Sequence, residues 1–313
     1  MELATHKRRF SPRLKPLAAC LAAALAISAG SAAADARALS QQPLASRPPS
    51  LLNGAAPPPW QRLTPVPSMA EVHHPFPHEI PALPAATIPV TNCDDSGAGS
   101  LRNALQNVAV DGDTVDMTGL SCSLITLTTG SILFFQNNIT LQGPGSTSLF
   151  LSGGTGSSRV APLLHDGTGT LSINDMTIED GAKYFTSAQI DNARGGCIFS
   201  AGFVSLSDSE VKYCTAQNTG TTYGALGGAV YAATGILMSN SSVLDSSVSG
   251  VPFGNGGGLY TPGFITMADS FVEGNTASLH GGGVQARGGG GDLIKYSQIS
   301  NNEAFSAVGV YTY

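Results

Sequence analysis

The stretch that decides the fold runs from Gly227 to Leu244 and reads GGAVYAATGILMSNSSVL. It opens with a glycine pair and an aliphatic residue, continues with an alternating apolar pair, Ile236 and Met238, and then carries a Ser-x-aliphatic element ending at Val243. Side chains two residues apart on a strand face the same way, so each such element supplies one apolar row. The stretch therefore predicts short strands joined by glycine and serine turns.

The same pattern recurs along the chain as an internal repeat. The glycine openings are Gly195-Gly196-Cys197-Ile198, Gly227-Gly228-Ala229-Val230, Gly256-Gly257-Gly258-Leu259, Gly281-Gly282-Gly283-Val284 and a degenerate Ala307-Val308-Gly309-Val310. The alternating pairs are Val204/Leu206, Ile236/Met238, Ile265/Met267 and Asp292/Ile294, and the Ser-x-aliphatic elements end at Val211, Val243, Val272 and Ile299. Successive openings lie 32, 29, 25 and 26 residues apart, so loops at the corners must absorb the difference.

A unit of three short strands cannot bury its apolar row alone, whereas stacked units can, by pairing in parallel about 4.8 Å apart. The glycine pairs suit corners that need a positive φ or a close approach of backbones. We therefore predict an all-β protein, a right-handed parallel β-helix, with the handedness taken from the general rule for parallel crossovers. An antiparallel sandwich or barrel is the alternative, but it would show hairpin signals between strand pairs instead of recurring columns.

The region before the repeats predicts a cap. Residues 100–108 have helical periodicity, with Leu101, Ala104, Leu105 and Val108 on one face and Ser100 as the N-cap. A short helix here would cover the open end of the first coil. Arg102 is predicted to form an ion pair or bind carbonyl groups.

These segments resemble a known group of proteins. Residues 90–102, which contain DSGAGSLR, followed by Asp113-Thr114-Val115 and by ITLQGPG at 139–145, resemble the N-terminal cap of exported bacterial β-helix proteins. The glycine units resemble the repeats of polymorphic outer-membrane proteins and of pectin-lyase-like, choice-of-anchor proteins. The resemblance covers residues 88–313 and implies secretion or surface display, with adhesion or glycan contact.

Composition divides the chain into three parts. Residues 1–34 hold five basic side chains, an apolar run and a small-residue stretch, which is the pattern of a secretory signal peptide. Residues 35–87 carry most of the 19 prolines and predict a disordered linker. Residues 88–313 form the β-helix, with the cap and first coils at 88–160 and the glycine repeats at 161–313. We expect no transmembrane segment in the mature chain, and export to the bacterial surface or medium.

Charge and cysteine content narrow the function further. Without residues 1–34 the net charge is −10, which disfavours nucleic-acid binding. His73, His74 and His78 could form a metal site, but a solvated linker explains them better, and no cofactor or metal is expected. Four cysteines of the body predict two disulfides, with Cys93–Cys122 and Cys197–Cys214 favoured by proximity, while free buried thiols are the alternative.

Catalytic motifs do not stand out in the sequence. Gly-x-Ser-x-Gly, His-Glu-x-x-His and Walker-type loops do not occur, and the paired carboxylates of glycoside hydrolases are not evident on the predicted coils. The sequence therefore favours a protein that is not an enzyme. If it is one, a polysaccharide lyase or a glycoside hydrolase is the expected class.

Two outward columns are candidate sites. One holds Phe199, Tyr231, Tyr260, Gln285 and Tyr311, and is either a ribbon that stacks on sugar rings or a ladder that stabilises the solenoid. The other holds Asp175, Asp208, Asn240, Asp269 and Tyr296, and is either a set of turn residues or a weak Ca²⁺ site. In each case the structural role is favoured.

Three functions follow from these observations. The first is a non-enzymatic secreted or surface-displayed scaffold, adhesin or passenger-like, that contacts surface glycans or host cell-surface proteins. The second is a carbohydrate-binding or polysaccharide-degrading β-helix. The third is a structural piece of a longer anchored protein, because the fifth unit is incomplete at Tyr313. An open last coil also predicts end-to-end self-association.

Overall fold

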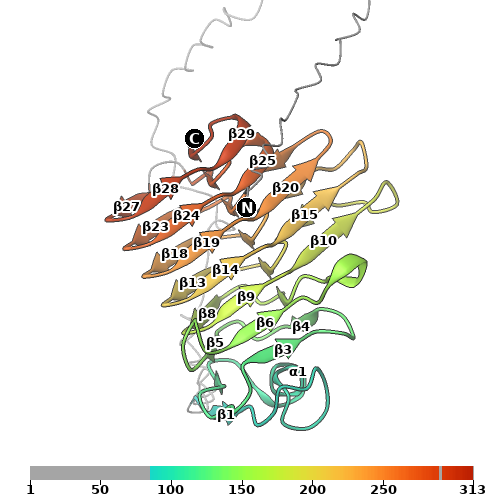
Figure 1. Cartoon of the computed structure of the whole chain (residues 1–313), viewed down its shortest axis with the longest axis vertical. Coiled ribbons are helices and arrows are strands. Elements are labelled where there is room, and N and C mark those ends of the chain that lie inside the picture. Colours follow the sequence, from blue (N-terminus) through green and yellow to red (C-terminus); the bar gives the residue numbers. More distant parts are fainter. Residues whose placement is uncertain (1–84, 289–290, 313) are drawn as a thin grey trace, which may run out of the picture. The chain divides into compact units, whose positions relative to one another are not determined.

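The computed structural model describes residues 85–288 and 291–312, and these form a parallel β-solenoid (Figure 1). The predicted signal peptide, most of the predicted linker and its three histidines lie outside the described residues. Every strand pair is parallel and joins one coil to the next, so the predicted all-β stacked fold is confirmed. No helix within the described residues is long and apolar enough to cross a membrane.

The first two coils (residues 114–134 and 139–165) pass through sheets A, B and C, and the later coils pass through four sheets in the order A, B, D and C. Sheet A contains β1 (Thr87–Pro89), β2 (Thr114–Asp116), β5 (Ile139–Gln142), β8 (Thr170–Asn174), β13 (Phe203–Ser207), β18 (Gly235–Ser239), β23 (Phe264–Ala268) and β27 (Leu293–Lys295). Sheet B contains β3 (Leu124–Thr126), β6 (Phe150–Ser152), β9 (Thr177–Glu179), β14 (Glu210–Lys212), β19 (Ser242–Leu244), β24 (Phe271–Glu273) and β28 (Gln298–Ser300).

Sheets C and D close each coil. Sheet C contains β4 (Ile132–Phe134), β7 (Leu163–His165), β12 (Ile198–Ser200), β17 (Val230–Ala232), β22 (Leu259–Thr261), β26 (Val284–Ala286) and β30 (Val310–Thr312). Sheet D contains β10 (Ala182–Phe185), β15 (Thr215–Asn218), β20 (Ser247–Gly250), β25 (Thr276–His280), β29 (Glu303–Ser306), β11 (Ala193–Arg194), β16 (Ala225–Leu226) and β21 (Gly254–Asn255).

The alternating residues predicted from the sequence fill the interior. Val204 pairs with Ile236, which pairs with Ile265, and Leu206, Met238 and Met267 form the adjacent row. All six side chains are fully buried. In the last described coil Ile294 continues the second row but is 39% exposed, so the end-to-end self-association expected there stays a prediction.

In the coils that start from β8 onward, three corners of each coil turn on a residue with positive φ. The corner between sheets A and B uses Asp175, Asp208, Asn240, Asp269 and Tyr296. The corner between B and D uses Asp180, Tyr213, Asp245, Gly274 and Asn301, and the corner between D and C uses Gly195, Gly227, Gly256, Gly281 and Ala307. A Cβ on Gly227 would clash with the carbonyl oxygen of Val230, which explains why the repeat opens with glycine.

A ladder of buried serines supports the corner between sheets A and B. The Ser241 hydroxyl donates to the carbonyl of Ser239 (2.8 Å) and accepts from the main-chain N–H of Ser209 one coil below (3.2 Å). Ser270 repeats both bonds one coil further on. The serine of each repeat therefore satisfies backbone groups that the turn removes from the sheets.

For the glycine-opened repeats the predicted three-strand unit is wrong, because sheet D adds further strands to these coils, whereas the first two coils have three strands each. Between its two arms lie loops at residues 186–192, 219–224 and 251–253, and these project from one side of the solenoid (Figure 1). In the next coil β25 continues without such a loop and pairs with both β20 and β21. The unequal repeat intervals therefore come from these loops, which together with their strands we call the fin (residues 182–194, 215–226 and 247–255).

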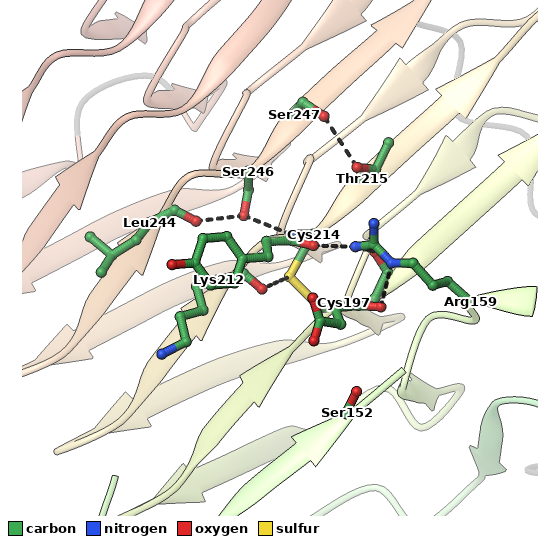
Figure 2. Close-up of a disulfide and its surroundings, with 12 residues drawn as sticks. Ser152, Arg159, Cys197, Lys212, Cys214, Thr215, Leu244, Ser246 and Ser247 are labelled. Atoms are coloured by element: carbon green, nitrogen blue, oxygen red, sulfur yellow. Dashed lines mark hydrogen bonds between the residues drawn. A yellow bond between two sulfur atoms is a disulfide. The ribbon is translucent and has the colours of Figure 1, made fainter. Parts of the chain in front are cut away.

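Both predicted disulfides are confirmed, as Cys93–Cys122 and Cys197–Cys214. The second is completely internal, and Ser246 of the next coil accepts a hydrogen bond from the N–H of Cys214 at 3.1 Å (Figure 2). The same two positions hold different pairs in successive coils, namely Cys197/Cys214, Ala229/Ser246, Gly258/Asn275 and Gly283/Asn302.

The two side chains of each pair compensate one another in size. Where one side has asparagine, the other has glycine, and a Cβ on Gly258 would lie only 3.2 Å from the Asn275 amide. Asn275 uses that space to donate its side-chain N–H groups to the carbonyl of Val243 (3.0 Å) and to Asn302 Oδ1 (3.0 Å), while its own Oδ1 accepts from the main-chain N–H of Ser246 (3.0 Å). At these two interior positions, one coil therefore has a disulfide bond, and the following coils have hydrogen bonds that run along the solenoid axis.

This equivalence predicts the outcome of a double substitution. Cys197→Ala with Cys214→Ser copies the Ala229/Ser246 pair of the next coil, so the solenoid should still form. Because the cross-link closes a 17-residue separation, its loss should lower the free energy of unfolding by about 3 kcal/mol. Urea unfolding of the oxidised wild type and the variant measures this difference. An unfolded variant would contradict the proposed equivalence of the two coils.

Candidate functional site

The first predicted column faces outward along the whole of sheet C. Pairing places Leu133, Leu164, Phe199, Tyr231, Tyr260, Gln285 and Tyr311 one above another in successive coils. The sequence predicted the last five positions, and the structure extends the column to Leu164 and Leu133 near the N-terminal cap.

The middle of this column is a stacked ladder. The ring centroids of Phe199 and Tyr231 lie 5.6 Å apart with planes 9° from parallel, and Tyr231 and Tyr260 are 5.6 Å apart at 8°. Gln285 interrupts the ladder, and Tyr311 stacks instead on His280 at 4.8 Å. The stacking inferred from the sequence is therefore present from Phe199 to Tyr260.

The ladder is covered by the fin. Tyr231 is 8% exposed and Tyr260 is 4% exposed, and they form an apolar cluster with Leu226, with Phe253 packed against it. Burial raises the pKa of Tyr231, although the Arg194 guanidinium over its ring opposes this. Neither ring exposes a face to solvent. The stacking of sugar rings on Tyr231 and Tyr260 therefore stays a prediction, and it would require the fin to move away from sheet C.

The acidic column lies at the corner between sheets A and B, where all five residues have positive φ. Gln142 donates to the Asp175 carboxylate (2.9 Å) and Asn240 donates to that of Asp208 (2.5 Å). Amide donors therefore reach two of the carboxylates of the column. Among the described residues no group of three or more His, Cys, Asp or Glu side chains is arranged to hold a metal ion.

The outer face of sheet B carries an ionic cluster around Lys212. Its Nζ lies 2.6 Å from Glu210 Oε1 and 3.7 Å from Glu179 Oε2. Burial lowers the pKa of Lys212, but Glu210 and Glu179 outweigh it and raise the pKa above its usual value. Burial and Asp180 raise the pKa of Glu179. A lysine held in its charged form is an ion-pair partner and a poor nucleophile.

The N-terminal cap is built as the sequence predicted, with one difference. Helix α1 (Leu101–Asn103) is followed by the π-helical turn η2 (Ala104–Val108), and the Ser100 hydroxyl accepts from the N–H of Asn103 at 3.2 Å. Leu101, Ala104 and Leu105 are buried as expected, whereas Val108 is 47% exposed. The wider π-turn, closed by the bond from Ala109 N–H to Ala104 carbonyl, rotates Val108 off the buried face.

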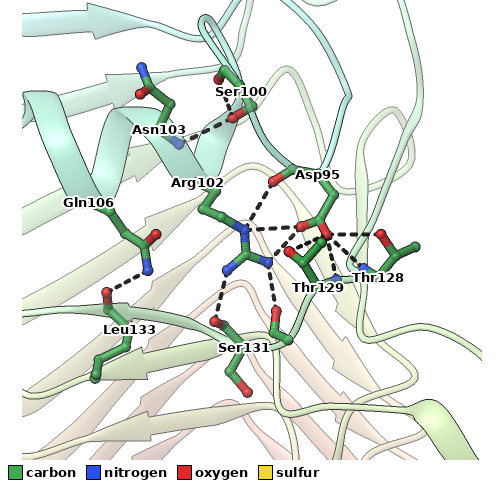
Figure 3. A network of polar contacts seen from close by, with 11 residues as sticks. Asp95, Ser100, Arg102, Asn103, Gln106, Thr128, Thr129, Ser131 and Leu133 are labelled. Atoms are coloured by element: carbon green, nitrogen blue, oxygen red, sulfur yellow. Dashed lines mark hydrogen bonds and ion pairs between the residues drawn. The ribbon is translucent and has the colours of Figure 1, made fainter.

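Arg102 fastens the cap to the first strand of sheet C (Figure 3). Its guanidinium pairs with Asp95 (Nη2 to Oδ1, 2.6 Å) and donates to the carbonyls of Gly130 (2.6 Å) and Ser131 (2.9 Å). The other carboxylate oxygen of Asp95 accepts from the main-chain N–H groups of Thr128 (2.9 Å) and Thr129 (2.7 Å). Arg102 was predicted to form an ion pair or to bind carbonyl groups, and it does both.

Hydrogen bonding decides the ionisation of Asp95. Burial by itself raises the pKa of this carboxyl, but Arg102, Thr128 and Thr129 outweigh burial and hold the pKa well below its usual range. A carboxylate with a depressed pKa stabilises the fold above the unfolded-state pKa of about 3.9, and this contribution is lost as the pH falls toward the folded-state value.

We therefore expect Asp95→Asn to lower the free energy of unfolding by about 3 kcal/mol at pH 7, because it leaves a nearly buried guanidinium without its partner. The difference from wild type should narrow below about pH 4, because the carboxyl of the unfolded chain becomes protonated there while the folded-state carboxyl stays ionised to lower pH. Urea unfolding at neutral and acid pH measures both effects, with Asp94→Asn at the exposed neighbouring position as control. A difference that stays constant with pH would contradict this assignment.

The open part of the outward column ends in a cavity at the cap. The cavity measures about 480 Å³ and is lined by Leu105, Gln106, Leu133, Phe134, Phe135 and Gln136. Leu133 is 41% exposed and Phe135 is 64% exposed, while Leu105 and Phe134 are buried beneath them. This is an apolar surface open to solvent, in contrast to the covered rings of Tyr231 and Tyr260.

A buried histidine supports the strand that forms this cavity. His165 stacks on Phe134, and its Nδ1 lies 2.7 Å from the Ser200 hydroxyl and its Nε2 lies 2.7 Å from the Gln136 carbonyl. Burial lowers the pKa of His165, against the effect of Asp166 and nearby carbonyls. A neutral imidazole that accepts from Ser200 and donates to Gln136 satisfies both contacts.

No known protein-family model, curated protein or solved structure matches this chain. The family resemblance seen in the sequence therefore stays a prediction, and the candidate site rests on its geometry.

The cavity at the cap was not predicted from the sequence. Its residues come from two segments about 30 positions apart, and neither Leu133 nor Phe135 belongs to a glycine-opened unit. Phe134 ends strand β4 and Phe135 follows it directly, so one of the two aromatic side chains is expected to face outward because successive side chains alternate in extended chain. That signal was available in the sequence, although the position of the cap helix beside it was not.

Proposed function

We propose that this protein is a non-enzymatic scaffold that is secreted or displayed on the cell surface and adheres to glycans or proteins of other surfaces. The observation that carries the proposal is a solenoid in which the most closely paired ionisable groups serve its architecture. Asp95 and Arg102 fasten the cap, and Asp208 turns a corner. Lys212 is held in an ion pair. Such an arrangement suits presentation of a rigid surface better than proton transfer.

Two features support export. Both disulfides lie in the described body, and structural disulfides persist in oxidising compartments outside the cytosol. The basic, apolar and small-residue order of residues 1–34 is that of a secretory signal. Bacterial origin and the resemblance to polymorphic outer-membrane and pectin-lyase-like proteins belong to the same proposal.

A second candidate function is carbohydrate binding, with or without cleavage of a polysaccharide. One observation favours it, namely the outward apolar column of sheet C, in which Phe199 and Leu164 are partly buried and Leu133 is exposed beside the cavity at the cap. Aromatic and aliphatic side chains in a row are a common platform for sugar rings.

Adhesion and cleavage are separated by one pair of measurements on the oxidised full chain. Beads coated with the protein should adhere to glycan-bearing or cell surfaces more than beads coated with reduced, unfolded protein. The same protein should release neither reducing ends nor unsaturated products from pectin and alginate. Product release that grows with protein concentration would contradict the non-enzymatic assignment, and equal adhesion of both bead types would contradict the adhesive one.

A further inference from the structure

We propose that the side-chain amine of Lys183, at the N-terminal end of the fin, is a covalent attachment site that forms an imine with a small uncharged aldehyde. Lys183 lies on β10, which is the strand at one edge of sheet D (Figure 1). The site goes beyond the adhesive function proposed above, because it is a reactive group on sheet D and not part of the outward column of sheet C.

Lys183 begins a column of the fin that is otherwise apolar. It pairs with Ala216, which pairs with Val248, which pairs with Ala277. These three side chains belong to the buried apolar cluster of the fin, and Phe185 packs against the same cluster. The Lys183 Nζ lies 5.3 Å from the centroid of the Phe185 ring. The amine therefore stands at the end of an apolar layer, with its alkyl stem available to cover that layer.

No carboxylate or carbonyl oxygen contacts this amine among the residues that the structure describes. The other lysine and arginine side chains that are partly buried in this part of the chain each contact such an oxygen, namely Arg102, Arg159, Arg194 and Lys212. A charge that leaves water without a partner is costly, so the surroundings of Lys183 disfavour its protonated form.

The two lysines with shifted ionisation differ in direction for this reason. Burial alone acts on Lys183 and lowers its pKa, whereas Glu210 and Glu179 outweigh burial at Lys212 and raise the pKa there. A desolvated lysine with a lowered pKa has more of its amine in the neutral form, which is the nucleophile. Lys183 thus has the surroundings of a reactive amine, and Lys212 has those of an ion-pair partner.

The amine can also be reached from solvent. Lys183 is only partly buried, and its Nζ is not among the described side-chain atoms that are both buried and without a hydrogen-bond partner. Because no hydrogen bond satisfies this nitrogen within the described residues, it keeps accessible surface. A small aldehyde can approach it there, and the Phe185 ring and the alanine side chains favour an uncharged one.

The reaction needs no co-reactant. The neutral Nζ adds to the aldehyde carbon, and one N–H proton passes through water to the oxygen, which gives a carbinolamine. The hydroxyl group then leaves with the second N–H proton as water, and the C=N bond forms. Nothing is oxidised or reduced, and the step reverses when water returns.

The test labels the oxidised full chain with propanal at about pH 7, where ordinary lysines are almost fully protonated. Sodium cyanoborohydride reduces each imine to a stable secondary amine, and peptide mass spectrometry follows the labelling of each lysine with time. Lys183 should be labelled several times faster than the exposed Lys295, and Lys212 should be the slowest of the three. The advantage of Lys183 over Lys295 should shrink toward about pH 10, as the other amines also become neutral.

Two controls separate the fold from the side chain. In urea that unfolds the chain, the three lysines should be labelled at similar rates, because their differences come from the fold. Lys183→Arg keeps the stem and the charge and should retain the wild-type circular dichroism and urea midpoint, with Lys212 and Lys295 labelled as before. Labelling of Lys183 no faster than Lys295 at neutral pH would overturn the proposal and indicate a charged amine suited to an anion. An advantage that stays the same at alkaline pH would also overturn it, because access alone would then explain the rate.

Discussion

The structure depends on one backbone constraint, which is that each coil after the first two must turn at three corners through a single residue with positive φ. Asp208, Tyr213 and Gly227 serve one coil, and their counterparts recur one coil above and below. Because each corner lies between strands that pair with the neighbouring coil, a corner that shifts by one residue would turn apolar side chains outward. The register of the interior, the serine ladder and the outward columns all follow from these positions.

The corners also explain why some surfaces are structural and others are available for binding. Aspartate and asparagine at the corner between sheets A and B adopt positive φ more readily than most residues, so the acidic column has a backbone reason to exist. The corner between D and C brings the fin against sheet C, where Tyr231 and Tyr260 become buried. Below the fin, Leu133 and Phe135 keep an open face because the cap packs beside them without covering them.

Part of this organisation could be predicted from the sequence, for identifiable reasons. Strands of sheets A and B carry alternating aliphatic residues, such as Ile236/Met238 and Val243, so their inward rows could be read directly. Both disulfide pairings could be chosen by proximity, because each joins residues within about one coil of the other. Ser100 and Arg102 also fulfilled their predicted roles, because capping and ion pairing depend on neighbours close in sequence.

The remainder depended on contacts that the sequence does not encode locally. Strands of sheet D, such as Thr215–Asn218 and Ser247–Gly250, are short and polar and have no apolar alternation to reveal them. The covering of Tyr231 depends on where the fin folds back. The cavity lies beside a π-turn that supplies Leu105 and Gln106 to its lining, and this turn could not be predicted because residue periodicity assumes an α-helix.

The most direct test of this account compares two corner substitutions by urea unfolding of the oxidised chain. Gly227→Ala places a Cβ at positive φ against the carbonyl of Val230 and should lower the free energy of unfolding by about 3 kcal/mol. Asp208→Gly keeps its corner free to adopt positive φ and should change it by about 1 kcal/mol or less. Equal effects of the two substitutions, or a stable Gly227→Ala protein, would contradict the claim that the corners set the register of the solenoid.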